Sequence, residues 1–239
     1  MSPPWQDPRV RRGMEKLMQL RRERIAAGDR AIGWKLAFGP KVLQERLGIS
    51  APLVGFLTQG SARQSGASVS FDGWVKPVAE PEIAAYIGRD LPGGADVKTV
   101  KAAIARLGPA IELVDLARPP EDPEVVLAGN ISHRYVVLGP ADAAFAGGRT
   151  EGLTGRIFRR GEEFARTNQV DELTDNLVGL VKYVADYLAA FGERLRNGEF
   201  VICGSIMPPV ALEPDETEFG YTLDPIGEVS VHFSAGPVK

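Results

Sequence analysis

The sequence predicts an α+β fold, in which many short strands form the body and a few helices accompany them. Three observations support this. Short apolar runs bounded by glycine and proline recur along the chain, helical patterns occur only at intervals, and the two do not alternate as in a doubly wound sheet. A period-two pattern near residues 229–233 indicates a closing hairpin. No internal repeat and no low-complexity linker is visible.

The composition is that of an ordinary globular protein. The chain has 239 residues, of which 44% are hydrophobic and 25% charged, and its net charge is −3. This length fits one large domain, or one domain with a small N-terminal extension. The slightly acidic balance argues against a nucleic-acid partner. No stretch approaches the roughly 18 apolar residues of a membrane span, and residues 1–7 lack an apolar leader, so we expect a cytoplasmic protein.

Oxygen ligands must carry any metal chemistry in this sequence. The chain has one cysteine, Cys203, and two histidines, His133 and His232. This excludes a thiolate cluster and a histidine-rich metal centre. We interpret Cys203, within an apolar strand, and His232, within the last alternating strand, as structural residues.

The N-terminal part contains two helices and a strand. Apolar residues at helical spacing predict a helix over residues 7–27, and the interleaved charges of residues 21–24 predict a solvated helix face. A strand over residues 32–39 follows, and then a short helix over residues 40–47, opened by proline. Lys35 is the only charge in that strand. It is either a functional lysine or a structural one whose ammonium reaches solvent.

Residues 76–87 supply the first candidate site. On a strand, Glu80 and Glu82 point to the same face. Pro81 between them favours extended backbone and removes one ladder donor, as at a sheet margin or in an irregular strand. Two carboxylates held together either raise a pKa or recruit a cation. The alternative is a solvated strand face.

A third carboxylate lies in the apolar run 110–114. Glu112 would be carried on a largely buried strand, where an acid needs a partner or a metal. Three carboxylates suit a hard divalent ion such as Mg²⁺, which takes oxygen ligands and keeps positions for water or substrate. The third acid therefore favours a metal site over a solvated face.

The remaining segments predict elements around this site. The polar segment from Thr58 to Ser68 is a candidate lid loop. Small polar residues at 129–134 precede a strand and can present donors to a ligand, although ordinary turns have the same composition. The other expected elements are a helix over 96–107, a loop over 118–123, strands over 154–158, near 163 and over 200–206, the longest helix over 177–195, and a hairpin that turns at 224–227.

Five motifs, taken in order, resemble the fumarylacetoacetate hydrolase superfamily. They are Gly33-Trp34-Lys35-Leu36, the Pro77–Ala84 segment with its two glutamates, the 110–115 segment around Glu112, Asn130-x-Ser132 before a strand, and the 198–205 segment. The resemblance runs from roughly residue 8 to residue 234. Within the superfamily, the motifs are most similar to the 2-keto-4-pentenoate hydratase / 4-oxalocrotonate decarboxylase branch.

The resemblance implies a mixed β-sheet roll with flanking helices and an N-terminal helical extension. Residues 1–65 would form the N-terminal helical and short-strand region, and residues 66–239 the catalytic domain, in one compact unit. Members of this family commonly form homodimers or larger rings of dimers, and the branch includes paired hydratase and decarboxylase subunits.

The resemblance also implies a site. An Mg²⁺ or Mn²⁺ ion would be held by the three glutamates Glu80, Glu82 and Glu112. Lys35 and Ser132 map onto catalytic and substrate-binding positions, and Gly204 and Ser205 onto substrate-binding ones. The substrate would be a small 2-oxo acid. The implied activity is that of a metal-dependent lyase, hydrating a 2-hydroxy-2,4-dienoate in aromatic or related catabolism.

One departure from the family pattern bears on the reaction. Where the branch has Pro-Asp-aromatic-Gly, this chain has Pro52-Leu53-Val54-Gly55. Leu53 cannot move a proton, so His133 and Asp72 become candidates for that role, and His133 also has a structural interpretation. The departure keeps two alternatives open. One is a decarboxylase or C–C hydrolase of a 2-oxo diacid or acylpyruvate, and the other is a non-catalytic homologue that binds metal or a 2-oxo acid, or serves as a partner subunit.

Overall fold

The computed structural model describes residues 3–117 and 119–234. Its α-helices are α1 (Pro8–Ala26), α2 (Lys41–Leu47), α3 (Val97–Ala103), α4 (Pro123–Ala128) and α5 (Leu177–Ala189). Its strands are β1 (Ala31–Ala37), β2 (Leu53–Thr58), β3 (Ala62–Gln64), β4 (Ala67–Ser70), β5 (Pro77–Ile87), β6 (Ile104–Asp115), β7 (His133–Leu138), β8 (Thr154–Arg159), β9 (Glu162–Thr167), β10 (Phe200–Ser205), β11 (Val210–Ala211), β12 (Glu218–Asp224) and β13 (Gly227–Ser234).

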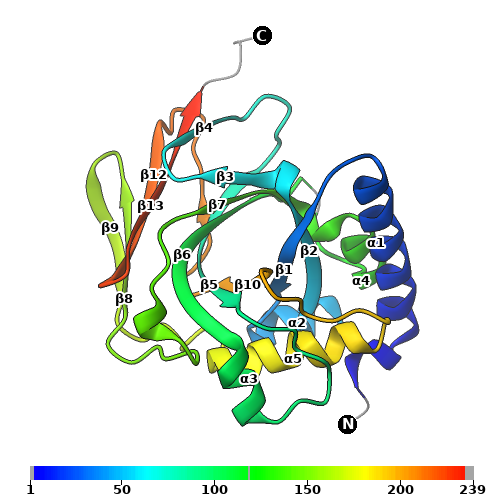
Figure 1. Cartoon of the computed structure of the whole chain (residues 1–239). Helices are drawn as coiled ribbons and strands as arrows, with labels where there is room; N and C mark the ends of the chain where they lie inside the picture. Colours follow the sequence, from blue (N-terminus) through cyan, green and yellow to red (C-terminus); the bar gives the residue numbers. More distant parts are fainter. Residues whose placement is uncertain (1–2, 118, 235–239) are drawn as a thin grey trace.

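Two mixed sheets form the body, and the larger one curls into a roll (Figure 1). This 8-stranded sheet has the order β2-β1-β10-β5-β6-β7-β3, with β11 also paired to β5. The β1/β10 and β3/β7 pairs are parallel, and the central pairs around β5 are antiparallel. The second sheet, with the order β4-β13-β12-β8-β9, lies beside the roll. The prediction of an α+β fold built on a mixed-sheet roll is confirmed.

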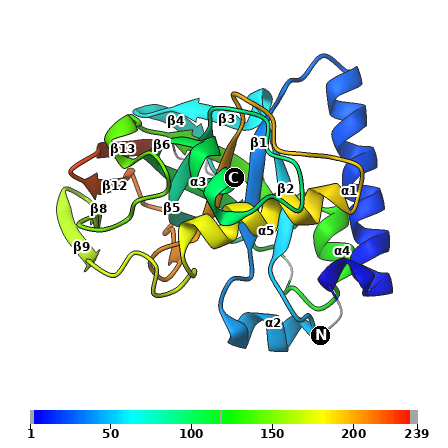
Figure 2. The same ribbon diagram turned by 60° about the horizontal axis from the view of Figure 1, so that its bottom comes forward.

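Helices cover two sides of the roll. Helices α1 and α4 lie together along one side, while α2, α3 and α5 lie below it (Figures 1 and 2). Gly13 explains the close approach of α1 to α4, since a Cβ at that position would lie 2.8 Å from the Cβ of Leu127. Helix α1 buries the apolar stripe Val10, Met14 and Leu17 against the body. Strands β1, β2 and β3 join the same sheet as the later strands.

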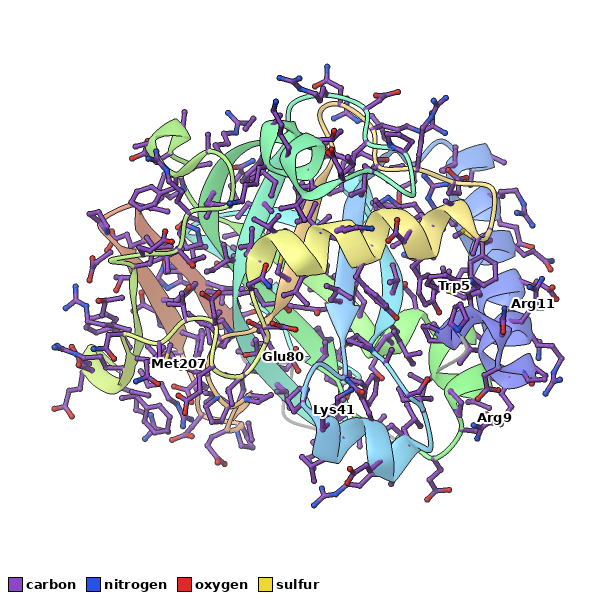
Figure 3. All side chains as sticks on the ribbon, turned by 90° about the horizontal axis from the view of Figure 1, so that it is seen from below. Trp5, Arg9, Arg11, Lys41, Glu80 and Met207 are labelled. Carbon is purple, nitrogen blue, oxygen red and sulfur yellow. The ribbon has the colours of Figure 1, made fainter. Side chains whose placement is uncertain are left out.

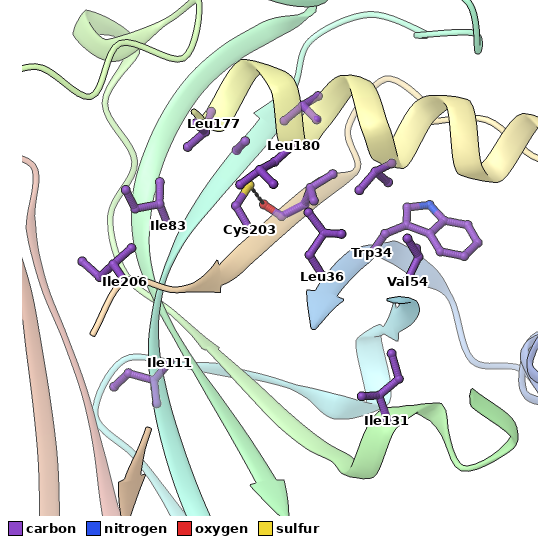
Figure 4. Packing of buried hydrophobic residues seen from close by; sticks show 14 of the residues in the cluster. Trp34, Leu36, Val54, Ile83, Ile111, Ile131, Leu177, Leu180, Cys203 and Ile206 are labelled. Atoms are coloured by element: carbon purple, nitrogen blue, oxygen red, sulfur yellow. Dashed lines mark hydrogen bonds between the residues drawn. The ribbon is translucent and has the colours of Figure 1, made fainter. Parts of the chain in front are cut away.

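A continuous core fills the space between the roll and the helices. Trp34, Leu36 and Val54 come from β1 and β2, and Leu180 packs on them from α5 (Figure 4). Cys203 belongs to this core, and its thiol donates to the carbonyl of Val201 at 3.5 Å. Burial raises the pKa of the Cys203 thiol, which agrees with a structural role. None of the described helices is long and apolar enough to cross a membrane.

Two helices end earlier than predicted. The helix expected over 96–107 ends at Ala103, because residues 104–107 extend β6 and pair with β5. The helix expected over 177–195 ends at Ala189, followed by a turn at Gly192 with φ +76°. Leu195 then forms a bridge with Leu91. The 19-residue helix α1, and not α5, is therefore the longest described helix.

Of the two alternatives for the strand with Glu80 and Glu82, a sheet margin is excluded because β5 lies in the middle of the large sheet, and the register shift beside Pro81 agrees with an irregular strand. Two further expectations are wrong. The Thr58–Ser68 segment is not a lid loop, since it contains β3 and enters β4, which pair with β7 and β13. Residues 21–24 are not fully solvated, because Arg21 stacks 4.7 Å over the Trp34 ring and pairs with Glu193. In the expected loop over 118–123, Arg118 lies outside the described residues.

Pro81 occupies the central strand because the adjacent ladder is irregular there. Ser205 pairs with Glu82, and the register of β10 against β5 shifts between Ile202 and Ser205. The carbonyl of Pro81 is still used, since it accepts from the backbone N–H of Ile206 at 2.9 Å. The missing N–H of Pro81 therefore falls beside a break in the pairing, where it costs little.

Candidate active site

Three glutamates meet where β5 and β6 pair. Glu80 lies directly opposite Glu112 in the register, and Glu82 follows two residues later on the same face of β5. One carboxylate oxygen from each of the three lies within 4.8 Å of the others. Glu82 and Glu112 are fully buried, and Glu80 is partly exposed. Strand alternation had predicted the shared face of the first two, and sheet pairing adds the third.

Burial and mutual repulsion shape the ionisation of this cluster. Burial, reinforced by the charge of Glu112, raises the pKa of Glu80 to about 7. Burial also raises the pKa of Glu82 well above its usual range, and the charges of Glu112 and Glu80 act in the same direction. Burial opposes ionisation of Glu112 as well, but the charge of Lys35 and the hydrogen bond with His133 outweigh it and lower the pKa of Glu112.

Lys35 is the buried cation of this cluster. Its side chain is 1% exposed, so the alternative of an ammonium that reaches solvent is wrong. The ammonium forms an ion pair with Glu112 and donates to the carbonyl of Ile131 at 3.3 Å. The lone charge of an apolar strand thus lies next to the carboxylates, as expected of a functional lysine.

His133 lies behind Glu112 and does not line the cavity described below. Its Nδ1 is 2.7 Å from Oε1 of Glu112, and its Nε2 is 3.0 Å from the hydroxyl oxygen of Ser61. Burial lowers the pKa of His133 and favours the neutral ring. Since the Glu112 carboxylate can only accept, the Nδ1–H of a neutral ring donates to it. His133 therefore orients Glu112.

The cluster has the donor set of a divalent-metal site. Oε1 of Glu82 and Oε2 of Glu112 are buried and have no hydrogen-bond partner among the described residues. The other oxygen of Glu82 accepts from the backbone N–H of Gly204 at 2.6 Å. Unsatisfied carboxylate oxygens that converge in this way are what a hard cation such as Mg²⁺ or Mn²⁺ would satisfy. The residues present therefore fit such an ion.

A strained turn forms another wall of the site. Asn130, Ile131 and Ser132 all have left-handed backbone, with φ of 50°, 54° and 58°. The Asn130 side chain holds the turn, since it donates to the carbonyl of Phe56 and accepts from the Phe56 N–H, each at 3.0 Å. Such backbone persists only where surrounding contacts impose it, and it clusters at functional sites. Here it directs the Ile131 carbonyl toward Lys35.

Gly55 makes room for this arrangement. A Cβ at Gly55 would lie 2.9 Å from Oδ1 of Asn130 and 3.0 Å from Cγ of Lys35. Asn130 and Gly55 both belong to the sequence motifs, but no local pattern indicates that the two residues meet. Asparagine tolerates positive φ better than most residues, so Asn130 is the one local sign of left-handed backbone in this turn.

A cavity of 580 Å³ opens beside the cluster. Residues of the predicted site that line it are Lys35, Glu80, Ser132, Gly204 and Ser205. Viewed from below, Glu80 lies between helix α5 and helix α2, on which Lys41 is labelled, with Met207 nearby (Figure 3). The rest of the lining is mostly apolar and includes Phe38, Leu43, Pro52, Val126 and Leu180.

Neither Asp72 nor His133, the two candidates for the role of the missing acid, lines the cavity. Leu53 is fully buried in the core and does not line the cavity, although Pro52 does. Asp72 is exposed just after β4 and does not line the cavity, so it is not brought to the site. His133 reaches the site only through Glu112. His232 is exposed on β13 and does not line the cavity either.

Comparisons with known proteins agree with the resemblance drawn from the sequence motifs. No family model matches the chain. Among curated proteins, it is 28% identical over 222 residues to the 2-hydroxyhexa-2,4-dienoate hydratase of Comamonas testosteroni, covering 91% of this chain and 83% of that protein. It is 26% identical over 212 residues to a 4-oxalocrotonate decarboxylase of a Pseudomonas species, covering 86% of this chain and 80% of that protein.

Solved structures share the fold. The 4-oxalocrotonate decarboxylase of Pseudomonas putida G7, complexed with magnesium and adipate, superimposes with a TM-score of 0.85 at 23% identity, covering 94% of this chain and 86% of that one. The fumarylpyruvate hydrolase of Pseudomonas aeruginosa, complexed with Mn²⁺ and pyruvate, gives 0.66 at 15% identity, covering 86% and 90%. By sequence, the chain is similar to 2-keto-4-pentenoate hydratases and a 4-oxalocrotonate decarboxylase, and it shares the fold of a solved 4-oxalocrotonate decarboxylase.

Proposed function

We propose that this protein is a metal-dependent lyase of small 2-oxo acids, and that its reaction is the hydration of a 2-hydroxy-2,4-dienoate. The observation that carries the proposal is the cluster of Glu80, Glu82 and Glu112, with unsatisfied oxygens, beside the buried ammonium of Lys35. Its relatives include hydratases of this substrate type. The decarboxylase and hydrolase neighbours were solved with Mg²⁺ or Mn²⁺.

In this proposal the three glutamates hold Mg²⁺ or Mn²⁺. A bound ion supplies Lewis-acid polarisation of the substrate's keto oxygen. Gly204 keeps Glu82 oriented through its N–H, and His133 does the same for Glu112. The three carboxylates must be ionised to bind the ion, and a bound cation would offset the burial and the mutual repulsion that raise the pKa of Glu80 and Glu82.

Lys35 and Ser132 are the proposed substrate-contacting groups of the chain. Lys35 lines the cavity and its ammonium pairs with Glu112 of the cluster, and in this proposal the ammonium binds a substrate carboxylate and holds a proton at Nζ. Ser132, held by the strained turn, lines the same cavity and offers a hydroxyl. Gly204 and Ser205 lie at the end of β10, line the cavity, and are the proposed substrate-binding residues.

Decarboxylation of a 2-oxo diacid is the second candidate. Leu53 motivates this alternative, because it replaces the acid that the branch has at that position and so leaves the reaction open. The decarboxylases among the relatives support it as well. Both reactions develop negative charge on the keto oxygen of the substrate, so the same cluster serves either one. Product analysis with a dienoate and an oxalocrotonate, offered side by side, separates the two.

The assembly and location of the protein are also part of the proposal. We infer a cytoplasmic protein that acts as a homodimer or a larger ring of dimers, or as one subunit of a hydratase–decarboxylase pair. Residues 1–65 and 66–239 would act as one compact unit. Light scattering of the purified chain, alone and with such a partner, measures the assembly.

Thermal unfolding tests the site before any substrate is known. We would measure the melting temperature with Mg²⁺ or Mn²⁺, with oxalate as a mimic of a 2-oxo acid enolate, and with both. A ligand at a hundredfold excess over Kd contributes about 2.7 kcal/mol of stability. We expect a shift that requires metal and oxalate together and disappears in Glu82→Gln. Absence of a shift under every combination would contradict the proposal.

A further inference from the structure

The cavity has two chemically different parts. Glu80, Ser132 and Ser205 lie with Lys35 on or beside the strands at the reactive part. The remaining wall is built largely from apolar side chains of the segments outside the roll. They include Phe38 before α2, Leu43 on α2, Val126 on α4 and Leu180 on α5.

Among the described lining residues, the distal wall offers no charge to a ligand. Asp115 lines the cavity, but its carboxylate accepts from the N–H groups of Val75 and Lys76, and it pairs with Arg134 at 3.0 Å. Its side chain is only 1% exposed. Thr174 contributes a hydroxyl, which already donates to the carbonyl of Asp175. Lys35 is the only basic side chain of the described lining, and it is held at the reactive part by Glu112.

The cavity is also much larger than the smallest substrate of the proposed reaction. Its volume is 580 Å³. This volume lies within the roughly 300–1,000 Å³ of pockets that hold drug-sized ligands, whereas a five-carbon hydroxydienoate has about eight non-hydrogen atoms. A ligand that fills the site must therefore extend from the reactive part onto the apolar wall.

We propose that the substrate carries an uncharged apolar tail, longer than that of a five-carbon dienoate, which lies against Phe38, Leu43 and Val126. The inference rests on the proposed function, because the 2-oxo acid group must bind at the glutamate cluster. A distal carboxylate would find no counter-charge among the described lining residues, and placing an unpaired charge against apolar side chains is unfavourable. Each buried methylene gains about 0.8 kcal/mol, which corresponds to about a fourfold gain in affinity.

The test compares saturated 2-oxo acids that differ only in the tail. With Mg²⁺ present, we would measure the Kd of 2-oxobutyrate, 2-oxooctanoate and 2-oxosuberate by calorimetry. 2-Oxooctanoate and 2-oxosuberate have the same chain length, but only 2-oxosuberate carries a second carboxylate at the end of its tail. We expect 2-oxooctanoate to bind at least about a hundredfold more tightly than 2-oxobutyrate, since four methylenes are added. We expect 2-oxosuberate to bind at least about tenfold more weakly than 2-oxooctanoate.

A pair of variants on α2 tests whether the substrate tail lies against the wall that contains Leu43. Leu43 lines the cavity, whereas Val42, its neighbour on the helix, is 53% exposed and does not line it. Leu43→Arg should weaken 2-oxooctanoate and strengthen 2-oxosuberate, each by about tenfold, because it places a cation at the wall. Val42→Arg adds the same charge outside the cavity and should leave both affinities unchanged.

The outcomes separate this inference from the function on which it rests. If no 2-oxo acid and no oxalate binds with metal, the proposed function fails. If 2-oxobutyrate binds but 2-oxooctanoate binds no better, or if 2-oxosuberate binds as tightly, the apolar-tail inference is overturned while the metal site stands. Should Leu43→Arg fail to fold, the wild-type series alone decides between these results.

Discussion

At the reactive end of the cavity, carboxylates and a lysine are buried within reach of one another, while the distal wall is lined by aliphatic, aromatic and proline side chains. The reactive end holds three acids against one buried lysine, and it leaves two carboxylate oxygens without partners among the described residues. The distal wall contains half-buried residues such as Phe38 and Leu43, which have no charge to satisfy.

This difference assigns separate tasks to the two ends. A cluster of like charges is unfavourable for folding, so its presence at the bottom of a cavity indicates a function that requires it. Apolar residues at the distal end exclude water and select a ligand by area and shape, without taking part in the chemistry. The reactive end should therefore govern metal binding and rate, and the distal end should govern the choice of substrate.

The largest expected effect comes from removing a ligand at the reactive end. Glu112→Gln should lower metal affinity by at least about a hundredfold, because changing even outer groups of a metal site costs about 10–100-fold. Turnover that depends on metal should fall with it. Calorimetric titration with Mn²⁺ measures the affinity.

Glu216→Gln is the matched control for this change. Glu216 is also buried, but it pairs with Arg159, far along the chain from the cluster. We expect this variant to be less stable than the wild type and yet to bind Mn²⁺ normally. Full metal-dependent turnover in Glu112→Gln would show that the ligands have been assigned wrongly.

Lys35→Met should have the next largest effect, and it separates rate from metal binding. The proposed role in binding the substrate and holding a proton predicts a loss of about 10²–10⁴-fold in kcat/KM. Removing one partner of a buried ion pair costs about 3–5 kcal/mol, so the metal-free variant should melt at a lower temperature. The shift produced by Mn²⁺ should persist, since the three glutamates remain. A rate within tenfold of the wild type would contradict the assigned role.

Much of the reactive end could be predicted from local patterns. Alternation along a strand placed Glu80 and Glu82 on one face, and the lone charges of apolar strands singled out Glu112 and Lys35. The meeting of Glu80 with Glu112 needed the pairing of two strands, which no local pattern contains. The resemblance to a family supplied that step.

The wrong predictions share a physical cause, which is pairing between distant segments. Residues 104–107 continue a helical pattern, but their pairing with β5 makes them strand. The Gly- and Ser-rich segment after Thr58 forms short strands because β7 and β13 supply partners. Pro81 indicated either a sheet margin or an irregular strand, and only the pairing with β10, with its register shift, shows that it is the irregular strand at the centre of the sheet. Tertiary context overrides propensity in each case.

The pH dependence of stability distinguishes the two ends further. The pKa of Glu80 is about 7 in the folded protein, above its ordinary value of 4.5. Between pH 4.5 and pH 7 the unfolded state releases the Glu80 proton, whereas the folded state retains it. Raising the pH therefore lowers the free energy of unfolding, and this destabilisation by Glu80 is absent below pH 4.5 and complete above pH 7. Without metal, the melting temperature of Glu80→Gln should exceed that of the wild type by a margin that grows from pH 5 to pH 8.

Metal should reverse this trend in the wild type. Because the ion binds ionised carboxylates, the shift caused by Mn²⁺ should increase as the pH rises toward 7 and above. Leu43→Ala, at the distal end, should change stability by an amount that does not vary over this range. A margin for Glu80→Gln that stays constant with pH would mean that Glu80 is already ionised in the folded protein at pH 5.

The smallest effect should come from Ser61, which touches the reactive end only through His133. Its hydroxyl oxygen is 3.0 Å from Nε2 of His133 and 2.9 Å from the carbonyl oxygen of Thr58, and its single O–H donates to one of these two acceptors. Ser61→Ala removes this hydrogen bond and should cost about 1 kcal/mol of stability. Since His133 keeps its contact with Glu112, kcat/KM should fall by only about two- to fivefold, less than the loss typical of direct outer-shell partners. A loss as large as that of Lys35→Met, measured with the same substrate, would extend the catalytic machinery through the sheet to Ser61, and the boundary between the reactive end and its structural support would have to be redrawn.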